Sequence, residues 1–145
     1  CPPHVSGPAG FKELLKGYNQ ALVFKIDVPT EKLLTNENRE FFKRLQKIAA
    51  ALEKTAIDQG YTSSKAFAGG SCKTIFCQDH PNCRVLAENG KCRHPETARP
   101  SMSGFGINVS QLMKAAGWHM DRITCKTDPA TVKQGMLCGL VLIGR

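Results

Sequence analysis

Four cysteines gathered in one short stretch are the residues of this sequence best suited to chemistry. A segment of 21 residues holds four of the seven cysteines, Cys72, Cys77, Cys83 and Cys92, with gaps of four, five and eight residues. Between them lie glycine, proline, asparagine and aspartate, which favour turns over regular helix or strand. Thiolates brought together by a turn-rich loop bind soft metals. The pattern therefore predicts a metal-binding loop within residues 69–103.

Four cysteine thiolates can hold a tetrahedral zinc ion or a [4Fe-4S] cluster. Zinc fingers and ribbons favour cysteines two to four residues apart, and only the first gap of this loop fits that spacing. Iron-sulfur clusters are bound through more varied spacings. The gaps therefore favour a [4Fe-4S] cluster, with zinc as the alternative. Disulfides and buried thiols without a ligand are the alternatives that involve no metal.

Basic and ring side chains next to these cysteines complete the predicted site. Arg93 and Arg99 would supply positive charge beside an anionic cluster or an anionic partner. His94 is a second-choice ligand, because a surface position or a hydrogen bond to a cluster sulfur is the commoner role for such a residue. The prolines and glycines that follow Cys92 restrict the chain or permit unusual dihedrals. We therefore predict that residues 93–109 close over the metal, and the alternative is a structural turn that leads into the helix at residue 109.

Three further cysteines stand outside the loop. Cys1 is an additional candidate ligand, because the two prolines after it fix the backbone in one direction, and we predict that it lies close to the loop. Cys138 belongs to an apolar run and is expected to be a buried small side chain. The pattern assigns no role to Cys125.

The composition indicates a basic globular chain. Among 145 residues, Lys and Arg outnumber Asp and Glu by 20 to 12, which gives a formal net charge of +8. No stretch approaches the ~18 consecutive apolar residues that a membrane span requires. The basic residues are scattered and only 7% of residues are aromatic, which argues against nucleic acid as a partner. We expect an acidic redox or enzyme protein as the partner, and no membrane.

The cysteine count bears on the compartment. Seven is an odd number, so a fully paired secreted framework would leave one cysteine over. No signal peptide is visible, and clustered cysteines in a reducing compartment bind metal more often than they form disulfides. These observations predict a cytoplasmic protein. Because the chain opens on Cys-Pro-Pro, we also expect that residues are missing before Cys1.

The elements that position the loop are predicted from hydrophobic patterning. Three apolar runs predict strands, at residues 21–26, 65–68 and 136–143. Three segments with helical spacing predict helices, at residues 11–18, 36–59 and 109–116. Asn36 is the predicted cap of the long helix. This order predicts a single α/β domain over residues 1–145, with a small, partly parallel sheet flanked by helices and the loop following a strand.

Several motifs resemble those of one known family. The chain is similar to the predicted metal-binding proteins of domain-of-unknown-function family 2284, found mostly in anaerobic bacteria and archaea. The motifs are Cys-Pro-Pro at the start, A-G-G-S-C ending at Cys72, C-R-H-P-E-T-A-R-P-S-M starting at Cys92, and G-I-N-V at 106–109. The resemblance covers nearly the whole chain and implies metal binding in an anaerobic setting, without supplying a reaction. Family members have residues before Cys-Pro-Pro and space their loop cysteines more tightly.

Function follows from the number of ligands. Four cysteines occupy every iron of a cubic cluster, which leaves no open iron for a substrate. The sequence therefore predicts an iron-sulfur protein that transfers electrons or serves as an accessory to an anaerobic enzyme. A zinc- or cluster-stapled binding module without redox activity is the alternative, and a metal-dependent enzyme of unknown reaction is the second. No nucleophile elbow or phosphate-binding loop is present to support an enzyme.

Overall fold

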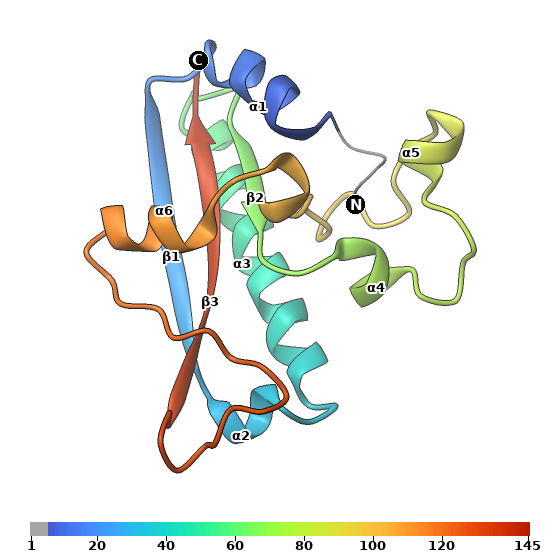
Figure 1. Cartoon of the computed structure of the whole chain (residues 1–145). Helices are drawn as coiled ribbons and strands as arrows, with labels where there is room; N and C mark the ends of the chain where they lie inside the picture. The colour runs from blue at the N-terminus through green and yellow to red at the C-terminus, as the bar shows by residue number, and fades with distance from the viewer. Residues whose placement is uncertain (1–5) are drawn as a thin grey trace.

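The computed structural model describes residues 6–145, apart from the side chain of Glu88 (Figure 1). It is a small α/β domain built from short helices, one long helix and a sheet. In chain order the elements are α1 (Gly7–Leu15), β1 (Gln20–Pro29), α2 (Thr30–Leu33), α3 (Asn38–Asp58), β2 (Lys65–Ala68), α4 (Cys72–Phe76), α5 (Arg84–Glu88), η1 (Ser103–Phe105), α6 (Val109–Ala115) and β3 (Gln134–Ile143).

The sheet has three strands in the order β1–β3–β2. Strand β3 pairs antiparallel with β1 along all ten residues of each strand, from Gln20 opposite Ile143 to Pro29 opposite Gln134. On its other side, β3 pairs antiparallel with the four residues of β2. The last strand of the sequence is therefore the central strand of the sheet.

The prediction of a partly parallel sheet is wrong, because both strand pairs are antiparallel. Strands β1 and β2 do run in the same direction, as a strand-helix-strand unit suggests, since each is antiparallel to β3. They do not pair, because β3 inserts between them. Among the described residues, parallel pairing is limited to an isolated bridge between Ala68 and Ser101.

Helices cover both faces of the sheet (Figure 1). Each face carries its own apolar cluster. Leu45 and Ala49 of α3 pack with Leu137 and Val141 of β3 on one face. The other face is lined by a second set of buried side chains: Phe67, Met102, Met113, Cys138, Leu140 and Leu142. Because its alternate side chains enter both clusters, β3 is apolar over residues 136–143, as the sequence predicted.

Two helix starts differ from the prediction. Helix α1 begins at Gly7, four residues before the predicted start at residue 11, because a proline in the first helical turn is well tolerated. The prediction that Asn36 caps the long helix is wrong: Glu37 occupies that position, and it makes no side-chain cap bond. Over residues 6–145, no helix combines the length and the apolar character needed to cross a membrane.

Candidate metal centre

The cysteine loop, residues 69–103, leaves the sheet at the end of β2 and returns beside the same strand. The backbone N–H of Ala68 donates to the carbonyl oxygen of Pro100 over 3.1 Å, and that of Met102 donates to the carbonyl of Ala68 over 3.2 Å. Gly69 donates to the carbonyl of Cys138 over 2.9 Å, which fastens the start of the loop to the central strand. Both ends of the loop are therefore held by the sheet.

Two short helices within the loop set the positions of three of its cysteines. The Ser71 hydroxyl accepts the N–H of Thr74 and caps α4, whose first residue is Cys72. Cys77 directly follows the last residue of α4, and Cys83 occupies the position before α5. The thiols are thus placed at helix ends, where the chain changes direction.

Hydrogen bonds from two basic side chains join separate parts of the cysteine loop. The Lys73 ammonium group donates to the carbonyl oxygen of His80 over 2.6 Å. The Arg93 guanidinium donates to the carbonyl oxygen of Asn82 over 3.0 Å. Arg93 therefore ties the segment after Cys92 to the segment before Cys83, and it shapes the loop through a carbonyl group.

The four loop thiols share one electrostatic environment. Burial raises the pKa of the Cys72 thiol, and the neighbouring thiols Cys83, Cys92 and Cys77 raise it further. A hydrogen bond from the Lys73 backbone opposes these effects, because it favours the thiolate. Each of the other three cysteines is therefore near enough to Cys72 to act on its charge.

The four loop thiols do not form a site for a single metal ion in this structure. Within residues 6–145, no group of three or more His, Cys, Asp or Glu side chains is arranged to hold one metal ion. The four thiols are free of disulfides and half-buried. Their side chains would have to converge further to surround a small ion such as zinc.

His94 contributes to the sulfur environment through its backbone. Its N–H donates to the Sγ atom of Cys92 over 3.3 Å. Its ring packs against the ring of Phe76 in α4, with 5.4 Å between the centroids. This contact joins the two halves of the loop. The hydrogen bond to sulfur comes from the main chain, and the role of the His94 side chain toward a metal stays a prediction.

Arg99 binds to α3, not to the thiols. Its Nη2 atom lies 2.7 Å from Oε1 of Glu53, and both side chains are largely buried, at 13% and 16% exposed. Its backbone N–H donates to Oε1 of Gln46 over 2.6 Å, and its Nη1 donates to the carbonyl oxygen of Pro95 over 2.9 Å. The charge of Arg99 is therefore matched by Glu53, and its action on a metal centre stays a prediction.

Helix α3 also holds the other end of the loop. The Nε and Nη2 atoms of Arg39 both donate to the carbonyl oxygen of Ile75, over 3.2 and 2.8 Å. Sequence reasoning missed these supports from α3, namely Arg39, Gln46 and Glu53. One signal was available: Gln46 lies among apolar neighbours in the helix, and it is fully buried. A polar residue at a core position indicates a buried hydrogen-bond partner.

The three cysteines outside the loop lie in different environments. Cys1 lies outside the described residues, so its predicted proximity to the loop stays a prediction. Cys125 is exposed on the segment between α6 and β3. Cys138 is 4% exposed in the second apolar cluster, which confirms its predicted burial. Burial raises the pKa of the Cys138 thiol to about 11.

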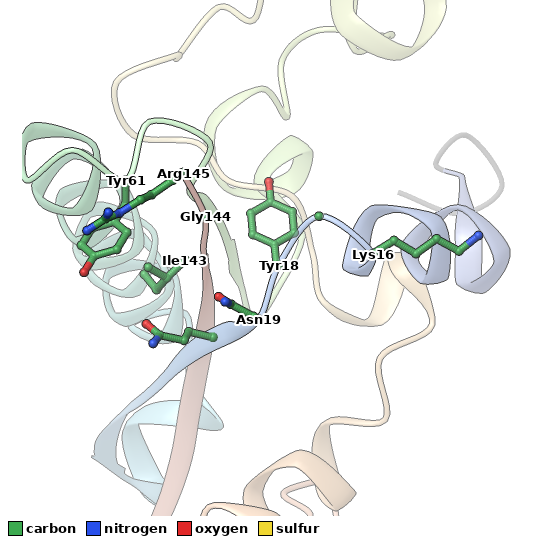
Figure 2. A pocket seen from close by; sticks show the side chains of 9 residues that line it. Lys16, Tyr18, Asn19, Tyr61, Ile143, Gly144 and Arg145 are labelled. Atoms are coloured by element: carbon green, nitrogen blue, oxygen red, sulfur yellow. The ribbon is translucent and has the colours of Figure 1, made fainter.

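A cavity of about 570 Å³ lies away from the cysteines, where β1 begins and β3 ends (Figure 2). Tyr18 and Tyr61 stand on opposite sides of the end of β3 in this view. The hydroxyl of Tyr18 donates to the carbonyl of Ser63 over 2.6 Å, and the Arg145 guanidinium lies 5.2 Å from the centre of the Tyr61 ring. The lining of this cavity includes none of the four loop cysteines, so the cavity is separate from the candidate metal centre.

Comparison with known proteins gives a family match. A family described as predicted metal-binding protein (DUF2284) matches residues 1–143. No curated protein and no solved structure matches the chain. The matched range includes the whole cysteine loop.

Proposed function

The chain belongs to this family of predicted metal-binding proteins, and we propose that it holds one [4Fe-4S] cluster through Cys72, Cys77, Cys83 and Cys92. The observation that carries the proposal is the shared environment of these thiols. Besides burial, the thiols of the three other loop cysteines raise the pKa of the Cys72 thiol. They act on Cys72 even though they come later in the sequence of the cysteine loop. Four thiols gathered in one loop form a donor set for soft metals.

The electrostatics of the loop fit a bound metal. Burial raises the pKa of the Cys72 thiol, and without a cation repulsion from the neighbouring thiolates raises it further. A metal cation reverses that balance, because it stabilises every thiolate that it binds. Backbone N–H groups of Lys73 and His94 already point at sulfur atoms. Such hydrogen bonds stabilise thiolates and tune the potential of a cluster.

Two observations support a cluster over zinc. Four sulfurs around one zinc lie only about 3.8 Å apart, given Zn–S bonds of about 2.3 Å. Among the described residues, no group of three or more Cys, His, Asp or Glu side chains is arranged to hold one metal ion, whereas the other three loop thiols do act electrostatically on Cys72. A cube of four irons holds its four ligands farther apart than one ion does. The gaps of four, five and eight residues support the same choice.

We further propose a role in electron transfer, or as an accessory to an anaerobic enzyme, in the cytoplasm. Ligation by four cysteines leaves no open iron, and a bound cluster would supply one-electron chemistry. The chain itself contributes burial of Cys72, N–H donors to sulfur and a basic surface. Its formal charge of +8 suits an acidic partner protein, because complementary charge speeds their encounter.

Metal analysis of anaerobically purified protein tests the cluster. We expect iron and acid-labile sulfide in near-equal amounts and broad absorption near about 400 nm, roughly as for thiolate-ligated iron. Serine substitutions at Cys72, Cys77, Cys83 and Cys92 should each lower iron and sulfide content. Cys125→Ser is the matched control, because this exposed thiol lies outside the loop. One zinc per chain with no sulfide would replace the cluster by the zinc alternative.

Reduction distinguishes electron transfer from a structural role. A redox-active cluster should bleach with dithionite, give a paramagnetic signal, and recover its colour on reoxidation with an acidic flavodoxin-type carrier. A cluster that keeps its oxidised spectrum with dithionite would support the stapled, non-redox module instead.

A further inference from the structure

A second cavity, of about 510 Å³, lies directly beside the cysteine loop. It is formed where the start of α3 faces α4, the helix that carries Cys72. Arg39 and Phe42 line it from α3, and Ser71, Thr74 and Gln78 line it from the loop. Its volume lies within the range of sites that bind small molecules.

The lining of this cavity has a clear polarity. Arg39 is the charged residue in it, and no carboxylate joins it among the residues that the structure describes. Amide side chains of Asn36 and Gln78 add hydrogen-bond donors. Two N–H groups of Arg39 bind the Ile75 carbonyl, out of the five that a guanidinium carries. The cavity therefore offers one fixed positive charge with polar groups around it.

An apolar wall faces these donors. The ring of Phe42 lies against the backbone of Gly70, where φ is +80° and an added Cβ would come within 2.8 Å of the Phe42 ring. Glycine at this position thus permits both the turn into α4 and the close approach of the ring. Ile75 extends the apolar surface. The wall is built into the turn that begins the cysteine loop.

We propose that this cavity binds a small carboxylic acid with an apolar body. The carboxylate is bound by Arg39 and the neighbouring amides, and the apolar body lies against Phe42 and Ile75. A single cation matches a monoanion better than a doubly charged phosphate, and the apolar wall gives inorganic anions nothing to contact. This ligand goes beyond the proposed cluster and does not depend on which metal the loop holds.

Calorimetric titration of the full chain with 1-naphthoate tests the proposal. A ligand of this size that makes average contacts binds with Kd near about 1 mM. We expect 1-naphthoate to bind at that level or tighter, and the neutral 1-naphthamide and inorganic phosphate to bind at least about tenfold more weakly. Equal affinity for acid and amide, or no binding of 1-naphthoate up to about 10 mM, would overturn the proposal.

Variants locate the binding site. Thr74→Phe fills the cavity from an exposed position on α4 and should abolish 1-naphthoate binding. Arg39→Gln should weaken it at least about tenfold. Arg44→Ala is the matched control, because it removes an exposed charge from the same helix and should leave binding unchanged. Unchanged binding in Thr74→Phe would overturn the proposal even if Arg39→Gln failed to fold. Iron, zinc and sulfide measured on the same samples report separately on the cluster.

Discussion

The sheet and the cysteine loop are held in place by different forces. In the sheet, β3 is buried on both faces, and the side chains of Leu45 and Phe67 that pack on it are fully buried. In the cysteine loop, Ile75 is buried, and the other buried residues among the described side chains, Ser101 and Met102, lie where the loop returns to β2. Links from Arg39 and from Glu53 hold that segment to α3.

Because different interactions hold the sheet and the cysteine loop, we expect their folding to depend on metal to different degrees. Burying one Leu or Phe side chain stabilises a fold by about 1.5–3 kcal/mol. One hydrogen bond contributes a net of only about 0.5–1.5 kcal/mol. We therefore expect the sheet and α3 to fold without metal, and the loop to reach its final form only when the metal binds.

The largest effect on stability is expected from Phe67→Ala. The Phe67 ring is fully buried and lies edge-on to Phe11 and Phe105, at 5.6 and 5.2 Å between centroids. Its removal should lower the free energy of unfolding by roughly 3–5 kcal/mol, measured by urea denaturation. Leu22→Ala, at an exposed position of β1, should change it by less than about 1 kcal/mol. Similar losses in both variants would contradict the importance of this cluster.

High pH should weaken the same core through Cys138. Burial raises its pKa in the folded chain from 9.0 to about 11. The folded state thus keeps a proton that the unfolded chain releases, so stability is complete below about pH 9 and falls as pH rises to about 11. Two pKa units correspond to about 2.7 kcal/mol. Urea titrations across this range should show a smaller decrease in Cys138→Ala. Equal pH dependence in both proteins would refute this origin.

A smaller loss of stability, with a larger loss of metal, is expected from Arg99→Ala. The substitution leaves the Glu53 carboxylate largely buried without its cation and frees the end of the loop. We expect about 1.5–3 kcal/mol lower stability, the range for hydrogen bonds to charged groups, together with reduced iron content. Arg93→Ala, which removes a bond to Asn82 within the loop, should cost less stability. If Arg99→Ala keeps wild-type stability and metal content, residues 93–109 are only a connector.

Metal removal should have the smallest effect on the sheet. After anaerobic chelation of iron, hydrogen exchange should become at least about tenfold faster at backbone amides of residues 72–92. Amides of β1 and β3 should change little, because their hydrogen bonds lie in the apolar sheet. Mass spectrometry of peptide fragments provides the measurement. Equal acceleration in β3 would show that the metal supports the whole domain.

Local sequence was sufficient for the three strands and for helices α1, α3 and α6, whereas the short helices α2, α4 and α5 were not predicted. The prediction of β2 at residues 65–68 is confirmed to the residue, and the helix predicted at 109–116 ends one residue earlier. The family is also confirmed. These features depend on hydrophobic period, turn residues and short motifs, which are properties of neighbouring residues. Ligation by the loop cysteines and Cys1 stays a prediction.

Only the tertiary structure decided which elements meet. An apolar run such as β3 is equally suited to several neighbours, so its insertion between β1 and β2 could not be read from its own residues. Arg99 forms its ion pair with Glu53, which lies 46 residues earlier in the sequence. Hydrophobic periodicity carries no information about such a distant pair. Hydrophobic period encodes which face of an element is buried. The choice of partner depends on packing of the whole chain.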